Sequence, residues 1–215
     1  MTSAKYFLPK FNADRFIKST IAGSMKQDAQ DFIWRVDCIK QNMEYGGYSF
    51  FSKIYVDLLM AIESDLKCLI ISLSKRDEKP EDAYIAARSK SHNISKLYAE
   101  VETRAKNRLK LLNSKDKEEI IYASTYIRVS NRYHLFSLLQ IREEDPINRD
   151  FGYGEYSSLL SLEYINELER ITFSLHEVTL SAMDRFLVPV MMSGCNISNY
   201  GDRLKEFKLK MDKKL

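Results

Sequence analysis

The chain has 215 residues, of which 45% are hydrophobic and 29% are charged, a composition typical of a globular protein with a sizeable core. Its 33 basic and 30 acidic residues leave a net charge of +3, too small to predict nucleic-acid binding by itself. Seven glycines and four prolines are too few for the frequent tight turns of a strand-rich sandwich. The composition therefore argues against an all-β fold.

The cysteine pattern and the hydropathy point to the cytoplasm. Cys38, Cys68 and Cys195 are odd in number and far apart, which favours free thiols in a reducing compartment. The first residues carry no apolar signal core, and no run approaches the ~20 apolar residues of a membrane-spanning helix. We expect a cytoplasmic protein without a membrane segment.

Residues 1–47 are predicted to form an N-terminal helical segment. Apolar residues recur at helical spacing over residues 14–43, and the pair 23–24, Gly-Ser, is a place where this helix is expected to divide. Trp34 lies beside the apolar stripe and is expected to anchor the segment to the core. The glycine pair 46–47 predicts a helix end, because glycine readily adopts a positive φ.

Residues 55–101 predict a helical hairpin around which the rest of the chain is organised. Its first helix carries an apolar stripe at spacings of three and four. The stripe comprises Tyr55, Leu58, Leu59, Ile62, Leu66, Leu69, Ile70 and Leu73. Glu63 and Lys67 stand one turn apart on the polar side and are expected to pair. Residues 75–82 are too polar to bury, and the second helix follows Asn93, whose side-chain oxygen suits an N-cap.

The remaining sequence predicts further helices. A third core helix is expected over residues 116–127, whereas residues 135–141 fit either a helix or a short extended stretch. Residues 142–157 contain Pro and Gly and form the expected subdomain boundary. Residues 158–187 show the longest helical pattern, and Asp202 is expected to cap a last helix with a basic outer face. The chain is therefore predicted to be all-α.

Metal and phosphate-loop motifs are missing. His92, His134 and His176 each stand alone, without another histidine or a cysteine at ligand spacing. The sequence also lacks a glycine-rich phosphate loop and a nucleophile-elbow motif. We predict no bound metal and no cofactor.

The turn around His92 is the first candidate site. Free N–H groups at a helix start, a titratable imidazole and nearby lysines suit an anion, because the dipole and the donors favour the same charge. The residues concerned are Ser89, Lys90, Ser91, His92, Asn93 and Lys96. The alternative, which the sequence favours about two to one, is an ordinary helix cap with His92 packed under it.

The segment from Arg128 to His134 is the second candidate site. An arginine and a histidine brought together suit metal-independent RNA cleavage, in which the imidazole moves a proton and the guanidinium stabilises phosphate charge. On a continuous helix, residues six apart lie roughly 240° apart, so these two side chains would meet only across a helix break or between two chains. Surface ion pairs of Arg128 and Arg132, with His134 at a helix end, are the favoured alternative.

Three of these stretches together resemble the HEPN (higher eukaryotes and prokaryotes nucleotide-binding) helical domain family. They are the run from Tyr55 to Ile70, the Lys90–Tyr98 stretch with its Ser-His-Asn-Ile step, and the Tyr126–Tyr133 stretch with its Arg-Tyr pair. The similarity covers about residues 48–140. It implies an up-and-down helical bundle over residues 48–141, extended by the N-terminal segment and by a C-terminal extension, residues 158–215, packed on the core.

The family resemblance implies two functional branches. RNases of the family use an arginine and a histidine separated by four to six residues; Arg128 and His134 match that spacing, but Val129 stands where a polar residue is expected. The other branch lacks this pair and binds nucleotides or acts beside a catalytic partner. The chain looks closer to this second branch, because of its His-Asn-Ile step.

The function that this second branch implies is that of an accessory or nucleotide-sensing subunit in a bacterial antiphage or toxin–antitoxin complex. Its partner would be an effector such as a sirtuin-like NAD-consuming protein or a nucleotidyltransferase, and a homodimer is a further option. A nucleotide is expected at one set of residues: Lys67, His92, Asn93, Lys96, Arg132 and Tyr133. The alternative is an RNase with Arg128 and His134 as its catalytic pair and RNA as its substrate.

Overall fold

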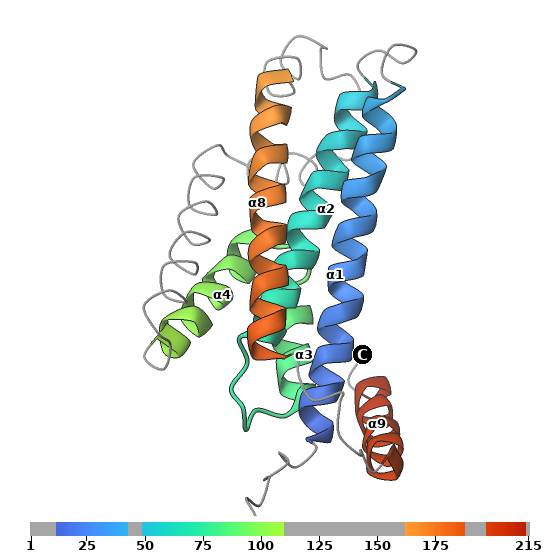
Figure 1. Cartoon of the computed structure of the whole chain (residues 1–215), viewed down its shortest axis with the longest axis vertical. Coiled ribbons are helices and arrows are strands. Elements are labelled where there is room, and N and C mark those ends of the chain that lie inside the picture. The colour runs from blue at the N-terminus through green and yellow to red at the C-terminus, as the bar shows by residue number, and fades with distance from the viewer. Residues whose placement is uncertain (1–11, 43–48, 110–161, 188–196, 214–215) are drawn as a thin grey trace, which may run out of the picture.

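The computed structural model describes residues 12–42, 49–109, 162–187 and 197–213, and every element within these ranges is a helix (Figure 1). The all-α prediction is confirmed. The helices are α1 (Ala13–Lys40), α2 (Ser49–Ser72), α3 (Pro80–Arg88), α4 (Ile94–Leu109), α8 (Leu162–Phe186) and α9 (Ile197–Asp212). The predicted helix over 116–127, the ambiguous stretch 135–141 and the glycine pair 46–47 lie outside the described residues.

Three long helices, α1, α2 and α8, form the body of the molecule (Figure 1). Helix α1 runs antiparallel to α2, since Arg35 pairs with Asp57 at one end while Lys18 reaches the Lys75 carbonyl at the other. Helix α8 also runs antiparallel to α1, with Lys40 bonded to Glu169 near its start. Helices α2 and α8 therefore run in the same direction.

Helix α2 lies at the centre and contacts α1, α3, α4 and α8. All eight residues of its predicted apolar stripe are buried, which confirms that prediction. Burial extends beyond the stripe to Ala61, Cys68 and Ile71, so that α2 is covered on nearly every side. Such an enclosed helix needs partners for every polar side chain that it carries.

The connection between α2 and α4 differs from the predicted hairpin, because the short helix α3 stands between them. Pro80 begins α3, where a missing N–H costs nothing and the ring already holds a helical φ. Glu81 is buried in its first turn, although residues 75–82 were expected to be too polar for burial. The prediction failed because Arg203, distant in sequence, supplies the compensating charge.

Helix α4 begins at the predicted cap. The Asn93 side-chain oxygen accepts a hydrogen bond from the Lys96 backbone N–H at 2.9 Å, so the N-cap prediction is confirmed. His92, just before α4, lies beside Glu63, whereas Arg104, near the end of α4, reaches the Ile70 carbonyl. Helix α4 therefore runs in the same general direction as α2 and crosses it obliquely (Figure 1). The short helix α3 carries the chain from the end of α2 back toward the start of α4.

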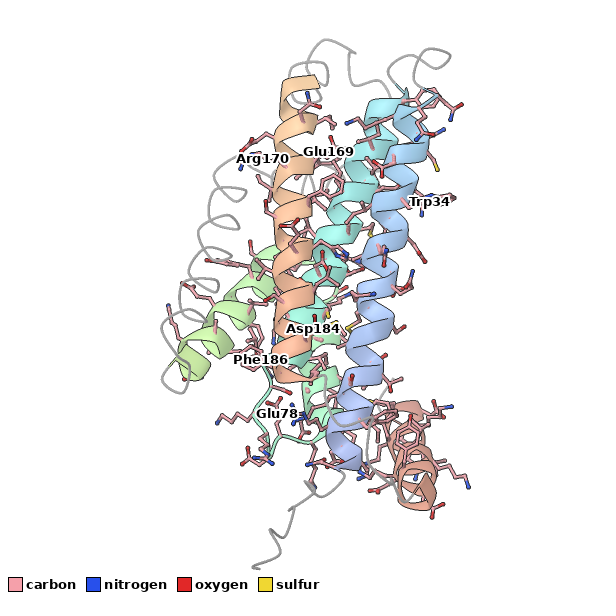
Figure 2. The ribbon with its side chains drawn as sticks, viewed as in Figure 1. Trp34, Glu78, Glu169, Arg170, Asp184 and Phe186 are labelled. Carbon is pink, nitrogen blue, oxygen red and sulfur yellow. The ribbon has the colours of Figure 1, made fainter. Side chains whose placement is uncertain are left out.

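Two expectations for the N-terminal segment are wrong. Helix α1 is continuous through Gly23, so no break divides it there. Trp34 does not anchor the segment: it is 65% exposed on the outer side of α1, away from α2 and α8 (Figure 2). The buried stripe passes instead through Ala29, Ile33 and Val36, and Trp34 falls just past its edge.

Helix α8 lies within the predicted range of 158–187. Five residues of its predicted apolar stripe, Ile165, Leu168, Ile171, Leu175 and Ala182, are buried, whereas Val178 and Phe186 of the same stripe are only partly buried. Helix α9 begins at Ile197, so Asp202 lies inside the helix, and its predicted capping role is wrong. The apolar side of α9, with Phe207 and Met211, packs on Ile17 near the start of α1.

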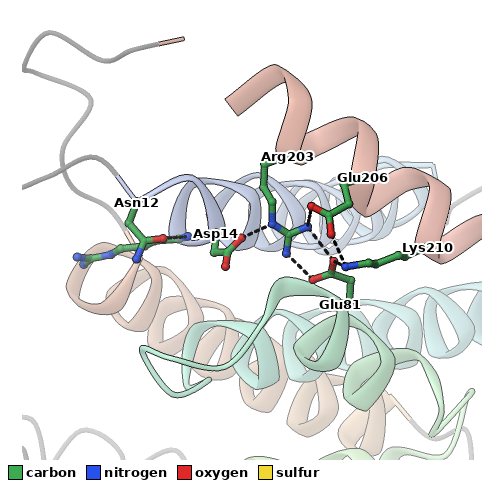
Figure 3. Close-up of polar contacts among 7 residues, drawn as sticks. Asn12, Asp14, Glu81, Arg203, Glu206 and Lys210 are labelled. Carbon is green, nitrogen blue, oxygen red and sulfur yellow. Dashed lines mark hydrogen bonds and ion pairs between the residues drawn. The ribbon is translucent and has the colours of Figure 1, made fainter. Parts of the chain in front are cut away.

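One guanidinium fastens α9 to both α1 and α3 (Figure 3). Arg203 donates two parallel hydrogen bonds to Glu81, at 2.8 and 2.7 Å, and a third to Asp14 at 2.7 Å. Lys210 lies 3.3 Å from the same Glu81 carboxylate. The hydrogen bonds from Arg203 lower the pKa of Glu81 to about 2. Glu81 therefore stays charged in the folded protein at all but strongly acidic pH.

Replacement of Arg203 with Ala is expected to lower the free energy of unfolding by about 3 kcal/mol at pH 7, because Glu81 is left buried without its partner. The loss is expected to shrink to about half or less by pH 3. A carboxylate whose folded pKa is depressed stabilises the fold above its unfolded pKa, and that contribution disappears as the pH falls through the folded value. Urea denaturation of both proteins at the two pH values measures the difference.

Lys205→Ala is the matched control on the same helix. Its ammonium is exposed and lies 3.7 Å from an equally exposed Asp202. Such a surface pair contributes at most about 1 kcal/mol. Equal losses in the two variants, or a loss for Arg203→Ala that is the same at both pH values, would contradict the role assigned to Arg203.

Candidate functional site

A buried carboxylate on α2 organises the first candidate site. Glu63 accepts a hydrogen bond from Lys67, one turn later on the same helix, so the predicted pairing is confirmed. The second Glu63 oxygen lies 2.9 Å from Nδ1 of His92. Glu63 is 5% exposed, whereas the His92 side chain is 67% exposed. Glu63 thus contacts both a nearly buried ammonium and a surface imidazole.

A tight turn between α3 and α4 presents His92. Ser91 has a φ of 49°, which side chains other than glycine rarely adopt. The Ser91 N–H donates to the Arg88 carbonyl at 3.0 Å, and the Asn93 N–H donates to the Lys90 carbonyl at 3.1 Å. A backbone held in this region costs of order 1 kcal/mol or more and persists only where its surroundings require it. The bond from His92 to Glu63 supplies one such constraint.

The cations of the site converge on the start of α4. Lys96 is exposed and has no ion pair within the part of the chain that the structure describes, whereas Lys90 lies 3.5 Å from Glu100. With Glu63 ionised, the Nδ1 proton of His92 is directed to it, and Nε2 remains open to solvent. Nε2 accepts a hydrogen bond when the ring is neutral and donates one when it is protonated. Together with the first N–H groups of α4, these side chains favour an anion.

The structure therefore brings together four of the predicted ligand residues. Lys67 and His92 meet through Glu63, and Asn93 and Lys96 follow at the start of α4. The Asn93 oxygen is occupied by its capping bond, which leaves its amide group for a ligand. Four other candidates, Arg128, Arg132, Tyr133 and His134, lie outside the described residues, and their roles remain predictions.

A buried acid–imidazole pair between α2 and α8 was missed by the sequence reasoning. Both oxygens of Asp65 lie 3.1 Å from Nδ1 of His176. Burial raises the pKa of Asp65, and the bond to His176 opposes that shift. The signal that would have revealed the pair is a titratable residue within each of two apolar helical stripes.

Asp57 is a third buried acid on α2. Arg35 of α1 pairs with it at 2.8 Å, and burial raises the pKa of Asp57 against the effect of that arginine. Its other oxygen, Oδ2, is buried without a hydrogen-bond partner in the described residues. Asp57, Glu63 and Asp65 thus each contact a guanidinium or an imidazole from a neighbouring element.

The described residues offer little for covalent or metal chemistry. Cys68 is fully buried, its Sγ donates to the Ala22 carbonyl at 3.3 Å, and burial raises the pKa of its thiol. A thiol in this state is a poor nucleophile at neutral pH. No three His, Cys, Asp or Glu side chains gather at ligand distance within the described ranges. None of the described helices combines the length and the hydropathy needed to cross a bilayer.

Comparison with models of protein families, with characterised proteins and with solved structures finds no match to this chain.

Replacement of Glu63 with Ala is expected to lower the free energy of unfolding by about 3 kcal/mol, because the ammonium of Lys67 would be left nearly buried without a partner. Chemical denaturation at neutral pH measures this loss. The control is Glu167→Ala, which removes a carboxylate paired with Arg170 on the surface of α8. That change is expected to cost less than about 1 kcal/mol. A Glu63 variant as stable as the control would show that the carboxylate does not organise the site.

Proposed function

We propose that this protein is a HEPN-like accessory subunit that senses a nucleotide or another phosphate-bearing ligand at the turn before α4. The observation that carries the proposal is the placement of His92 and Lys67 on one buried carboxylate, next to the start of α4 and Lys96. Phosphate oxygens are good acceptors for all of these groups. The sequence resemblance to the nucleotide-binding branch supports the same ligand class.

The charges at this site favour an anion over a cation. Lys67 neutralises Glu63, so that the outer part of the site consists of the imidazole and the Lys96 ammonium. Helix α4 adds partial positive charge from its free N–H groups. An anion that binds here accepts a hydrogen bond from Nε2 of the protonated ring, whose additional proton comes from the solvent, and the bond from Nδ1 to Glu63 is kept. Ligand binding is thereby coupled to the contact between α2 and the α3–α4 turn.

The proposal includes a protein partner, an effector subunit of a bacterial defence complex such as a sirtuin-like NAD-consuming protein or a nucleotidyltransferase. Apolar side chains stand exposed on the outer sides of two long helices: Trp34 on α1, and Phe173 and Leu180 on α8. Phe173 and Leu180 are seven residues apart and therefore lie on one face of α8. Exposed aromatic and aliphatic groups of this kind are common where a second protein binds.

The first test is nucleotide binding to the intact protein, measured by isothermal titration with AMP, ADP and ATP. His92→Ala and Lys96→Ala are each expected to weaken binding about tenfold, the loss that corresponds to one charge-assisted hydrogen bond. Lys106→Ala is the matched control, because Lys106 is exposed on the same helix and pairs with Glu102. Unchanged affinity in both site variants, with normal folding by circular dichroism, would contradict the proposal.

The rival function, RNA cleavage by Arg128 and His134, is tested separately. Purified protein incubated with single-stranded RNA in EDTA is expected to leave the RNA intact. Cleavage that His134→Ala abolishes and His92→Ala leaves unchanged would establish the RNase and overturn the accessory role.

A further inference from the structure

Helix α8 has one exposed face that carries both apolar and charged side chains. Five exposed residues follow one another there at alternating spacings of three and four: Arg170, Phe173, Glu177, Leu180 and Asp184. Because this pattern repeats every seven residues, all five lie along one side of the helix. The opposite side of α8 is the buried one that packs on the bundle. We call the five exposed residues the outer stripe of α8.

The two apolar residues of the outer stripe are large and accessible. Phe173 is 40% exposed and Leu180 is 37% exposed. They stand two turns apart, roughly 10 Å along the helix axis. A single exposed apolar side chain is ordinary, but two on the same helix face form a small apolar patch. The charges beside this patch indicate what covers it.

The charged residues of the outer stripe are arranged symmetrically around the apolar ones. Arg170 lies toward the start of α8 and Asp184 toward its end, so the stripe is basic at one end and acidic at the other (Figure 2). The midpoint between these two residues is position 177, and the midpoint between Phe173 and Leu180 lies between positions 176 and 177. The outer stripe is therefore complementary to a copy of itself that runs in the opposite direction.

The contact between Arg170 and Glu167 is compatible with a second carboxylate. Glu167 accepts two hydrogen bonds from the guanidinium, at 2.9 and 2.6 Å, and the Arg170 side chain is still 50% exposed. A guanidinium has five N–H donors, so it can serve two carboxylates at once. Arg104 and Arg203 each do so within this protein. Glu167 thus orients Arg170 without using all of its donors.

We propose that the outer stripe of α8 binds the same stripe of a second copy of this chain, in antiparallel orientation. Arg170 of each copy then faces Asp184 of the other, and Phe173 of each packs against Leu180 of the other. Such a contact is closed, because both copies use the same surface and a third copy has nowhere to add. It spans about 21 Å of helix, which is short for an interface, so we expect a weak dimer. Trp34, on a different helix, remains for the effector subunit.

Glu177 opposes this association. It lies at the centre of the outer stripe, so the two copies of Glu177 meet near the two-fold axis. Like charges placed opposite each other weaken an interface. Attraction at the two ends of the stripe therefore competes with repulsion at its centre. Glu177→Gln is expected to tighten the dimer about tenfold, a change that no contact within one copy would produce.

The test is sedimentation velocity of the full-length protein at about 10 µM to 1 mM, the range suited to a weak dimer. The wild type is expected to shift from monomer to dimer and no further. Arg170→Glu and Asp184→Lys are each expected to weaken the dimer about tenfold or more. An equimolar mixture of these two variants should form a heterodimer about as tight as the wild-type dimer, because each acidic end then meets a basic one. The chain that carries both substitutions should dimerise with itself for the same reason.

Asp28→Lys is the matched control, a charge reversal at an exposed position on α1 that should leave the dimer unchanged. A wild type that stays monomeric at the highest concentration, or that assembles beyond a dimer, would overturn the proposal. So would a dimer that both charge reversals leave intact, or a mixture of the two variants that remains monomeric. A dimer that Trp34→Ala removes and the α8 variants retain would place the contact on α1 instead, and likewise overturns it.

Discussion

The burial of three carboxylates on the central helix is the constraint on which the arrangement of the molecule depends. Asp57, Glu63 and Asp65 are each at most 5% exposed, and each is met by a guanidinium or an imidazole from a different neighbour. Arg35 comes from α1, His92 from the turn before α4 and His176 from α8. A buried charge without a partner costs several kcal/mol, whereas apolar contacts alone tolerate small rotations and slips. These pairs therefore fix how each neighbour is rotated and placed against α2.

The candidate ligand site follows from the same requirement. At Glu63 the partner is a histidine that remains largely open to solvent, so the residue that holds the α3–α4 turn in place also faces a ligand. The site thus combines a structural contact with a side that is open to solvent.

The sequence predicted the positions of the helices better than the side-chain pairs that join one helix to another. Periodicity identified the buried stripe of α2 and the inner face of α8, and capping chemistry placed the start of α4 at Asn93, because these features depend on local spacing. The contacts that bury Glu81 and Asp65 join residues more than a hundred positions apart, and local spacing does not say which residues pair. Trp34 shows the same limit, since a large apolar residue at the edge of a stripe is buried only if a neighbouring helix covers it. For the site, spacing alone paired Glu63 with Lys67, but the addition of His92 to that pair required the fold.

The most direct test of this account is a double-mutant cycle on Asp65 and His176, measured by chemical denaturation at neutral pH. If the buried pair holds α8 to α2, the double variant Asp65→Ala/His176→Ala should be less destabilised than the sum of the single variants by about 1.5 kcal/mol or more. Single losses that add to within about 0.5 kcal/mol would show that the two side chains act independently. That result would contradict the view that paired charges on α2 set the positions of its neighbours.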